Sequence, residues 1–260
     1  KYIVCDLENV EGLISVLPKD IDVLFHLAWY GVKTEFKNDY KAQMKNITIS
    51  FNIIEIARKL NIKKIIATGS ISEYSLCKDK VSGYENPTPS DLYGAFKVSV
   101  HYILETYTKN NNINFNWILV SSVYGPGRND NNIITYTIKM LLEGKSPEYT
   151  KLEQIWDFIY IDDLINAIYQ ISISGKSGVT YSVGSGISRQ LKNYIYQIRN
   201  KINKNIKLLI GVKPYKTDRI DNSIADISIL KKDTNFIPKQ SFSNGINKTI
   251  EYYKEHKNGY

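Results

Sequence analysis

The chain has 260 residues, of which 43% are hydrophobic and 23% charged, and its formal net charge is +8. This is ordinary globular composition, which excludes a disordered, collagen-like or small disulfide-bonded chain. A basic surface favours anionic partners, but the lysines are scattered and form no recognisable nucleic-acid motif, so we expect no nucleic-acid partner.

No run approaches the roughly 20 apolar residues that a membrane-spanning helix needs, and no secretory leader opens the chain, so we expect no membrane association. The two cysteines, Cys5 and Cys77, form no disulfide framework, which favours a reducing, cytoplasmic location. The chain begins at Lys1 and enters an apolar run at once, which suggests that an N-terminal segment is missing.

Along the first half, apolar strand-like runs alternate with amphipathic helix-like segments, which is typical of an α/β fold with a parallel sheet. We predict strands over residues 1–5, 22–28, 64–68 and 116–120. We predict helices over residues 40–60 and 90–109, the second of them capped by Ser90 or Asp91.

After residue 125 the strict alternation loosens, which suggests a second, smaller lobe. Further helices are expected over residues 133–143, 191–202 and 244–255, and one capped by Asp162 or Asp163 should run to Ile173. Short strands are expected over residues 158–161, 181–183 and 208–210.

Several kinds of site are not expected. The three histidines stand without a Cys/His/Asp cluster at ligand spacing, so we expect no metal site. The chain has no Gly-x-Ser-x-Gly nucleophile elbow and no complete phosphate-binding loop of the GxxxxGK[ST] type.

The strongest chemical signal is the Tyr-x-x-x-Lys spacing, although it occurs about as often as chance would give. Only Tyr93 and Lys97 fall near the start of a capped amphipathic helix, where residues four apart share one face. That helix follows a strand ending in Ser70. The other two matches are Tyr74/Lys78, in a polar loop, and Tyr253/Lys257, near the end of the chain.

A free phenol has a pKa of about 10 and is a poor base at neutral pH. An ammonium group one turn away should stabilise the phenolate, so we expect Lys97 to lower the pKa of Tyr93. Such a tyrosine can move a proton at a carbon that gains or loses hydride, with Ser70 bonded to the same oxygen. The spacing alone leaves open a buried tyrosine beside a solvated lysine.

Nine segments, in order, extend this signal over nearly the whole chain: Cys5-Asp6-Leu7, His26-Leu27-Ala28, 46–50, Thr68-Gly69-Ser70, 89–97, 123–127, 157–163, 181–186 and Gly245-Ile246. Together they resemble the extended short-chain dehydrogenase/reductases, in particular the branch of nucleotide-sugar epimerases, dehydratases and reductases. The resemblance implies a Rossmann-like doubly wound parallel sheet, its first strands missing, with a smaller substrate-binding lobe.

The resemblance also implies the organisation of the chain. Residues 1–124 would form the dinucleotide-binding lobe, incomplete at its N-terminal side. Residues 125–260 would form most of the substrate-binding lobe, interleaved around 156–184 with the last Rossmann elements. The cofactor would be NAD or NADP, and helices 40–60 and 90–109 would pair two copies into a homodimer.

By resemblance, the catalytic residues would be Ser70, Tyr93 and Lys97. Asp6 and Leu7 would contact the adenine, although Asp6 could instead be a turn residue. The other cofactor contacts would be Leu27, Ala28 and Trp29 at the diphosphate and ribose, Asn46 bracing a loop near the active site, and Ser121 at the nicotinamide end. Tyr93 and Lys97 would touch the cofactor as well.

The chain departs from the family pattern at several positions. The glycine-rich pyrophosphate loop should precede Lys1. Ile71 and Ser72 stand where related dehydratases carry Asp-Glu, which disfavours water elimination. Ser122 replaces an Asn that often contacts the substrate diphosphate, and Trp156 replaces an Arg that is common before Asp-Phe.

Four residues are the candidates for binding the substrate: Ser70, Ser122, Lys216 and Arg219. The last two could equally be plain surface charge. Three carboxylates near residue 160, Asp157, Asp162 and Asp163, are expected to be structural or capping rather than catalytic.

The resulting hypothesis is an NAD(P)-dependent nucleotide-sugar epimerase or 4-keto reductase that moves hydride and proton at the sugar C4. The alternative is a catalytically inactive relative that acts as a nucleotide- or protein-binding module.

Overall fold

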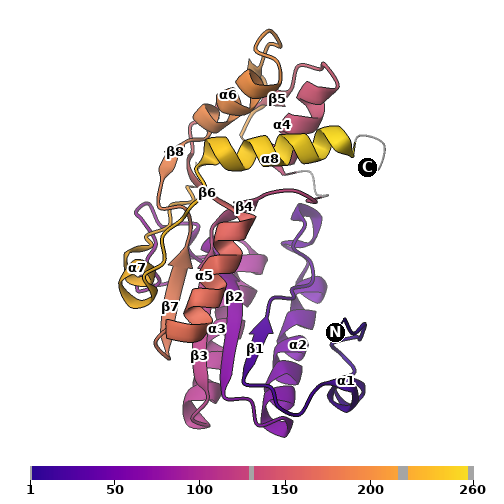
Figure 1. Cartoon of the computed structure of the whole chain (residues 1–260), viewed down its shortest axis with the longest axis vertical. Coiled ribbons are helices and arrows are strands. Elements are labelled where there is room, and N and C mark those ends of the chain that lie inside the picture. The colour runs from indigo at the N-terminus through magenta and orange to yellow at the C-terminus, as the bar shows by residue number, and fades with distance from the viewer. Residues whose placement is uncertain (1, 129–131, 216–221, 257–260) are drawn as a thin grey trace.

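Four parallel strands form the central sheet of the chain, whose computed structural model describes residues 2–128, 132–215 and 222–256 (Figure 1). They are β1 (Val23–His26), β2 (Lys64–Ser70), β3 (Asn114–Val120) and β7 (Val179–Val183), in the order β1-β2-β3-β7. Ser70 pairs with Val120, which pairs in turn with Val183, so three strands end at the same level. Side chains that follow these ends can therefore meet.

Helices cover both faces of this sheet. On one face α2 (Tyr40–Lys59) and α3 (Leu92–Asn110) share a core with β2 and β3, and α1 (Val10–Val16) packs on α2. On the other face lie α5 (Ile161–Ser174) and α7 (Ser228–Thr234). This three-layer arrangement confirms the predicted α/β fold with a parallel sheet.

A second group of elements lies beyond the carboxyl ends of the sheet strands (Figure 1). Its helices are α4 (Ile133–Leu142), α6 (Leu191–Ile202) and α8 (Phe242–Glu255), packed around an aromatic core that includes Tyr124 and Phe158. Its strands are β4 (Ser122–Tyr124), β5 (Glu148–Tyr149), β6 (Ile155–Tyr160), β8 (Ser188–Gln190) and β9 (Leu209–Ile210). The division of the chain at residue 124 stays a prediction.

Two short 3₁₀ helices complete the description: η1 (Thr34–Phe36), after β1, and η2 (Ile71–Tyr74), directly after β2. The helices in the described ranges are all too short or too polar to span a bilayer.

Two local predictions were wrong. No strand forms over residues 2–5, where Tyr2 and Val4 are 91% and 84% exposed. A strand needs a hydrogen-bonded neighbour, and the described residues provide none there. Helix α5 begins at Ile161 with Tyr160 as its N-cap, two residues before the earlier of the two expected starts. The carboxylate of Asp163 instead accepts the backbone N–H groups of Lys239 and Gln240, at 3.0 and 2.8 Å.

Candidate active site

The candidate site forms where β2 ends and α3 begins. Ser70 is the last residue of β2 and the N-cap of η2, where its Oγ accepts a hydrogen bond from the Ser72 N–H at 3.2 Å. Tyr93 lies in the first turn of α3, because the side chain of Asp91 caps this helix by accepting the Gly94 N–H at 2.8 Å. The cap is therefore Asp91, the second of the two residues expected.

The positions of Ser70 at the end of a strand and of Tyr93 at the start of a capped helix suggested that the two would lie near each other. The side chain of Ser70 is close enough to the phenol of Tyr93 to interact with it and lower its pKa. Burial has the larger and opposite effect and raises this pKa to about 12. The expected net lowering is therefore wrong for this structure, because removal from water disfavours the phenolate. Tyr93 is a protonated phenol at neutral pH.

Lys97 is anchored to the end of β2. It is 2% exposed, and its Nζ donates to the Thr68 carbonyl oxygen at 2.6 Å and lies 3.7 Å from the ring centre of Trp29. Burial lowers the pKa of Lys97, and the nearby carboxylate of Glu73 opposes this shift. The alternative of a solvated lysine is therefore excluded.

The sequence analysis missed Glu73, a fully buried carboxylate beneath the site. Its Oε1 accepts the Ser70 backbone N–H at 2.7 Å, and both of its oxygens lie 3.2 Å from the indole Nε1 of Trp117. Burial raises the pKa of Glu73. The Ser-x-x-Glu spacing from Ser70 is that of a capping box and could have indicated this contact.

Glycine at position 69 makes room for this buried group. A Cβ there would lie 2.2 Å from Nε1 of Trp117 and 2.3 Å from Oε1 of Glu73. Neither atom can move away without breaking the hydrogen bond between them. Gly69 therefore permits the carboxylate to reach the backbone of Ser70.

One cavity, of about 410 Å³, lies on the Trp29 side of Tyr93. Four of the predicted cofactor contacts are among its lining residues: Asp6, Leu7, Ala28 and Trp29. The Trp29 ring stands edge-on to that of Tyr93, with 6.0 Å between their centres. The structure therefore brings these residues, far apart in sequence, into one cavity, and one of them, Trp29, contacts the Tyr93 ring.

Two other predicted cofactor residues differ in their placement, and Asp6 has a second contact. Leu27 is 54% exposed and is not among the residues that line this cavity. Asn46 is buried, and its side chain accepts the Tyr30 N–H at 2.8 Å and donates to the Tyr30 carbonyl at 3.0 Å. It therefore braces the loop after β1. Asp6 Oδ1 accepts the Glu8 N–H at 3.0 Å, as a turn residue would.

A second cavity, of about 260 Å³, lies on the Ser70 side. Ser121, Ser122 and Trp156 line it together with Ser70. The indole Nε1 of Trp156 donates to the Ser122 hydroxyl at 2.6 Å, so the two residues that depart from the family pattern bond each other.

Ser121 offers a test of whether the site fits a dinucleotide. Its Oγ is buried and has no hydrogen-bond partner within the described ranges. An unpaired buried hydroxyl at the wall of a cavity fits the amide of a nicotinamide. The residues present therefore fit the expected cofactor. The predicted contacts Lys216 and Arg219 lie outside the described residues.

Comparison with known proteins places this geometry in a family. The model of the NAD dependent epimerase/dehydratase family matches residues 1–184. The chain belongs to this family. The family description names NAD, in agreement with the cofactor class expected from the sequence.

The family relatives differ in how much of them the chain covers. Protein CapI of Staphylococcus aureus is 26% identical, over 96% of this chain and 81% of the relative. A dTDP-glucose 4,6-dehydratase of Escherichia coli is 28% identical over 65% of this chain, and the chain spans only about half (50%) of that relative. Among solved structures, the UDP-glucuronic acid 4-epimerase of Bacillus cereus in complex with NAD matches with a TM-score of 0.84 and 25% identity, covering 98% of this chain and 81% of that one.

Proposed function

We propose that the protein is an NAD(P)-dependent nucleotide-sugar epimerase or 4-keto reductase acting at the sugar C4. The observation that carries this proposal is the meeting of Ser70 and Tyr93 between two cavities. One cavity is lined by residues expected at the cofactor. The other is lined by Ser70 and Ser122, expected at the substrate, and by Ser121, expected at the nicotinamide end of the cofactor. An epimerase from Bacillus cereus with NAD bound shares the fold at 25% identity.

Tyr93 moves the proton in the proposed reaction. Its phenol is protonated at neutral pH, so it can donate to the oxygen of a C4 ketone, and Ser70 can hydrogen-bond the same oxygen. Lys97 holds the end of β2 through Thr68, and this fixes Ser70 beside the phenol. NAD(P), when bound, supplies or accepts the hydride. Donation of this proton leaves a phenolate, and in the direction of oxidation it is this phenolate that takes the hydroxyl proton back.

The same geometry disfavours a dehydratase. Water elimination needs an acid and a base that reach the sugar, but Ile71 and Ser72 follow Ser70. Glu73, the next residue, is fully buried and is occupied by Ser70 and Trp117. We therefore restrict the proposed reaction to the transfer of a hydride and a proton at one carbon.

A homodimer is part of the proposal. Large apolar side chains stand exposed on the two helices expected to pair: Tyr40 (60%), Met44 (52%) and Phe51 (53%) on α2, and Tyr102 (51%) on α3. Apolar surface of this kind is stabilised when a second copy covers it.

The test measures turnover by the full-length protein with NAD or NADP. The substrates are UDP-glucose, UDP-glucuronate and a dTDP-4-keto-6-deoxyhexose. Tyr93→Phe removes the proton donor and should lower kcat by about 10²- to 10⁴-fold. Tyr84→Phe, at a residue 71% exposed, is the matched control. Unchanged turnover in Tyr93→Phe would refute the proposal, and binding without turnover by the wild type would favour the inactive binding module.

The epimerase and the reductase differ in whether they cause net oxidation of NAD(P)H. A reductase oxidises stoichiometric NAD(P)H when given the keto-sugar, whereas an epimerase returns its hydride and shows no net oxidation. Net oxidation therefore supports the reductase, and its absence alongside C4 inversion of UDP-glucose supports the epimerase.

A further inference from the structure

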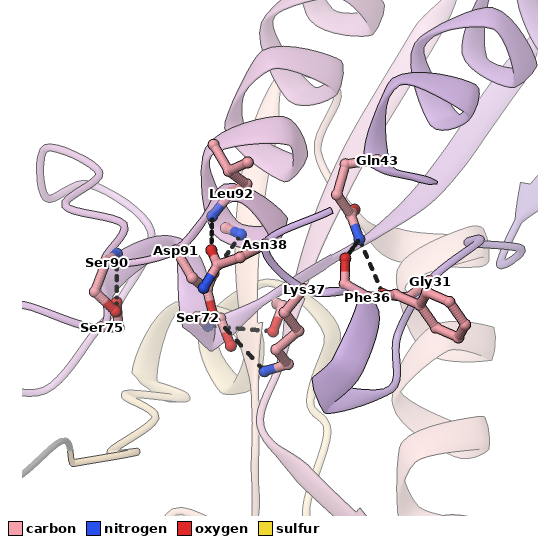
Figure 2. A network of polar contacts seen from close by, with 12 residues as sticks. Gly31, Phe36, Lys37, Asn38, Gln43, Ser72, Ser75, Ser90, Asp91 and Leu92 are labelled. Carbon is pink, nitrogen blue, oxygen red and sulfur yellow. Dashed lines mark hydrogen bonds and ion pairs between the residues drawn. The ribbon is translucent and has the colours of Figure 1, made fainter. Parts of the chain in front are cut away.

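The loop that follows β1 is fastened to the start of α3 (Figure 2). The backbone N–H of Tyr93 donates to the Lys37 carbonyl at 2.8 Å, and the N–H of Leu92 donates to Asn38 Oδ1 at 3.0 Å. These N–H groups belong to the first turn of α3 and have no partner within the helix. The two bonds therefore fix the backbone of Lys37 against the catalytic tyrosine.

The loop is also held from its other side (Figure 2). The buried amide of Gln43 donates to the carbonyls of Gly31 and Phe36, at 2.9 and 3.0 Å. Gly31 has φ +75°, and a Cβ there would lie 2.9 Å from the Gln43 amide nitrogen. The position of Lys37 is therefore built into the fold before any ligand arrives.

The residues Lys37 and Asp91 both line the second cavity, together with Ser70. The Nζ of Lys37 lies 5.0 Å from the ring centre of Tyr93 and 4.0 Å from Asp91 Oδ2. A separation of 4.0 Å is too long for a hydrogen bond. The helix cap uses the other carboxylate oxygen, Oδ1. With respect to the residues that the structure describes, the pair thus keeps an unused donor and an unused acceptor near Tyr93.

We propose that Lys37 and Asp91 together bind one hydroxyl of the substrate sugar within two carbons of the one that reacts, the 3-hydroxyl or the 6-hydroxyl. A sugar hydroxyl both accepts and donates, so it can accept from Lys37 and donate to Asp91. The two charges balance, which gives the pair no preference for a carboxylate. This inference rests on the proposed function and adds a specificity determinant to it.

The experiment compares two variants with a control. Lys37→Met removes the donor, and Asp91→Asn removes the charge of the acceptor while keeping a residue that caps helices well. Lys33→Met, at an exposed lysine of the same loop, is the control. Each protein is assayed with the fastest substrate of the panel above and with its 3-deoxy and 6-deoxy analogues.

Lys37→Met and Asp91→Asn should each lower kcat/KM by about 10- to 100-fold on the parent sugar, chiefly through KM, because a hydrogen bond to a charged group is lost. The loss should shrink to about threefold or less on one of the deoxy analogues, which lacks the hydroxyl concerned. Lys33→Met should stay close to the wild type. An equal loss on every sugar, no loss, or a loss confined to UDP-glucuronate would overturn the inference.

A failure of the proposed function can be distinguished from a failure of the inference about Lys37 and Asp91. Tyr93→Phe should abolish turnover of all sugars alike, whereas the effects at Lys37 and Asp91 depend on the sugar. Calorimetric binding of UDP-glucose and its deoxy analogues repeats the comparison without turnover. If no panel sugar reacts, the same dependence of Kd on the deoxy position would support the pair, and its absence would overturn it.

Discussion

Two pairs of opposite charges flank Tyr93, and they differ in what they contact. The inner pair, Glu73 and Lys97, is 0% and 2% exposed. The side chains of the outer pair, Lys37 and Asp91, are 32% and 22% exposed. Both pairs lie within reach of the same phenol.

Both residues of the inner pair form hydrogen bonds with other groups of the protein. Lys97 donates to the Thr68 carbonyl, and Glu73 accepts from the Ser70 backbone. Removing charges from water is costly, so a buried pair persists only when its remaining polar atoms are bonded. The outer pair stays partly exposed and, among the described residues, keeps free bonding capacity. We therefore assign a structural role to the inner pair and a role in substrate binding to the outer pair.

The largest expected effect lies in the inner pair. Glu73→Ala would remove the opposite charge that acts on the buried Lys97 ammonium and would leave the Ser70 N–H without its acceptor. The free energy of unfolding should fall by about 3–5 kcal/mol. Urea unfolding measures this, with Glu11→Ala, an exposed carboxylate on α1, as the control. A loss below about 1 kcal/mol would mean that Glu73 is not an architectural residue.

Two buried histidines near the inner pair should make the stability of the protein sensitive to acid. Burial lowers the pKa of His101 from 6.5 to about 4, and this ring stacks on Trp117 at 4.7 Å between centres. Burial and the charge of Lys97 likewise lower the pKa of His26 to about 4. The unfolded chain then binds more protons than the folded one between these values, so stability falls as the pH drops from 6.5 towards 4.

Each of the two histidines should cost about 2 kcal/mol of stability between roughly pH 7.5 and pH 5. His101→Phe keeps an aromatic ring against Trp117 and should remove its share of this pH dependence. The measurement is urea unfolding at both pH values, with His256→Gln at an exposed residue as the control. An unchanged pH slope in His101→Phe would contradict the assignment.

Much of the fold could be predicted from local signals. The helix expected over residues 191–202 is α6 with the same bounds, because its apolar positions recur at helical spacing. The meeting of Ser70 and Tyr93 was also predictable, since one residue ends a strand and the other begins a capped helix. Both signals lie within a few residues of each position.

What could not be predicted depends on distant neighbours. Glu73 is held by Trp117, which lies 44 residues further along the chain in the adjacent strand. The pKa of Tyr93 is set by burial, which spacing along a helix does not reveal. No local pattern marks Lys37, because its position depends on a loop that is bonded to α3. The bond between Asn38 and Leu92 joins residues 54 apart in the sequence.

A smaller effect is expected in the outer pair at Asp91. Its Oδ1 caps α3, so Asp91→Ala should cost about 1 kcal/mol of stability, whereas Asp91→Asn should be close to neutral. Thermal or urea unfolding of both variants measures the difference. Equal losses in the two variants would show that the charge of Asp91, and not its capping hydrogen bond, stabilises the helix. Asp91 would then have a structural role like that of the inner pair.

The smallest effect is expected at Lys37, and the same substitution at Lys97 makes it a direct comparison. Lys37→Met gives up a partly solvated ion pair at 4.0 Å and a cation–π contact at 5.0 Å, which together should contribute less than about 1 kcal/mol. Lys97→Met leaves Glu73 as an uncompensated buried charge and should cost about 3–5 kcal/mol. Urea unfolding of the two variants separates them, because only the buried lysine is part of the architecture. Similar losses in both would mean that Lys37 also stabilises the fold, and its free donor could then no longer be assigned to the substrate on structural grounds.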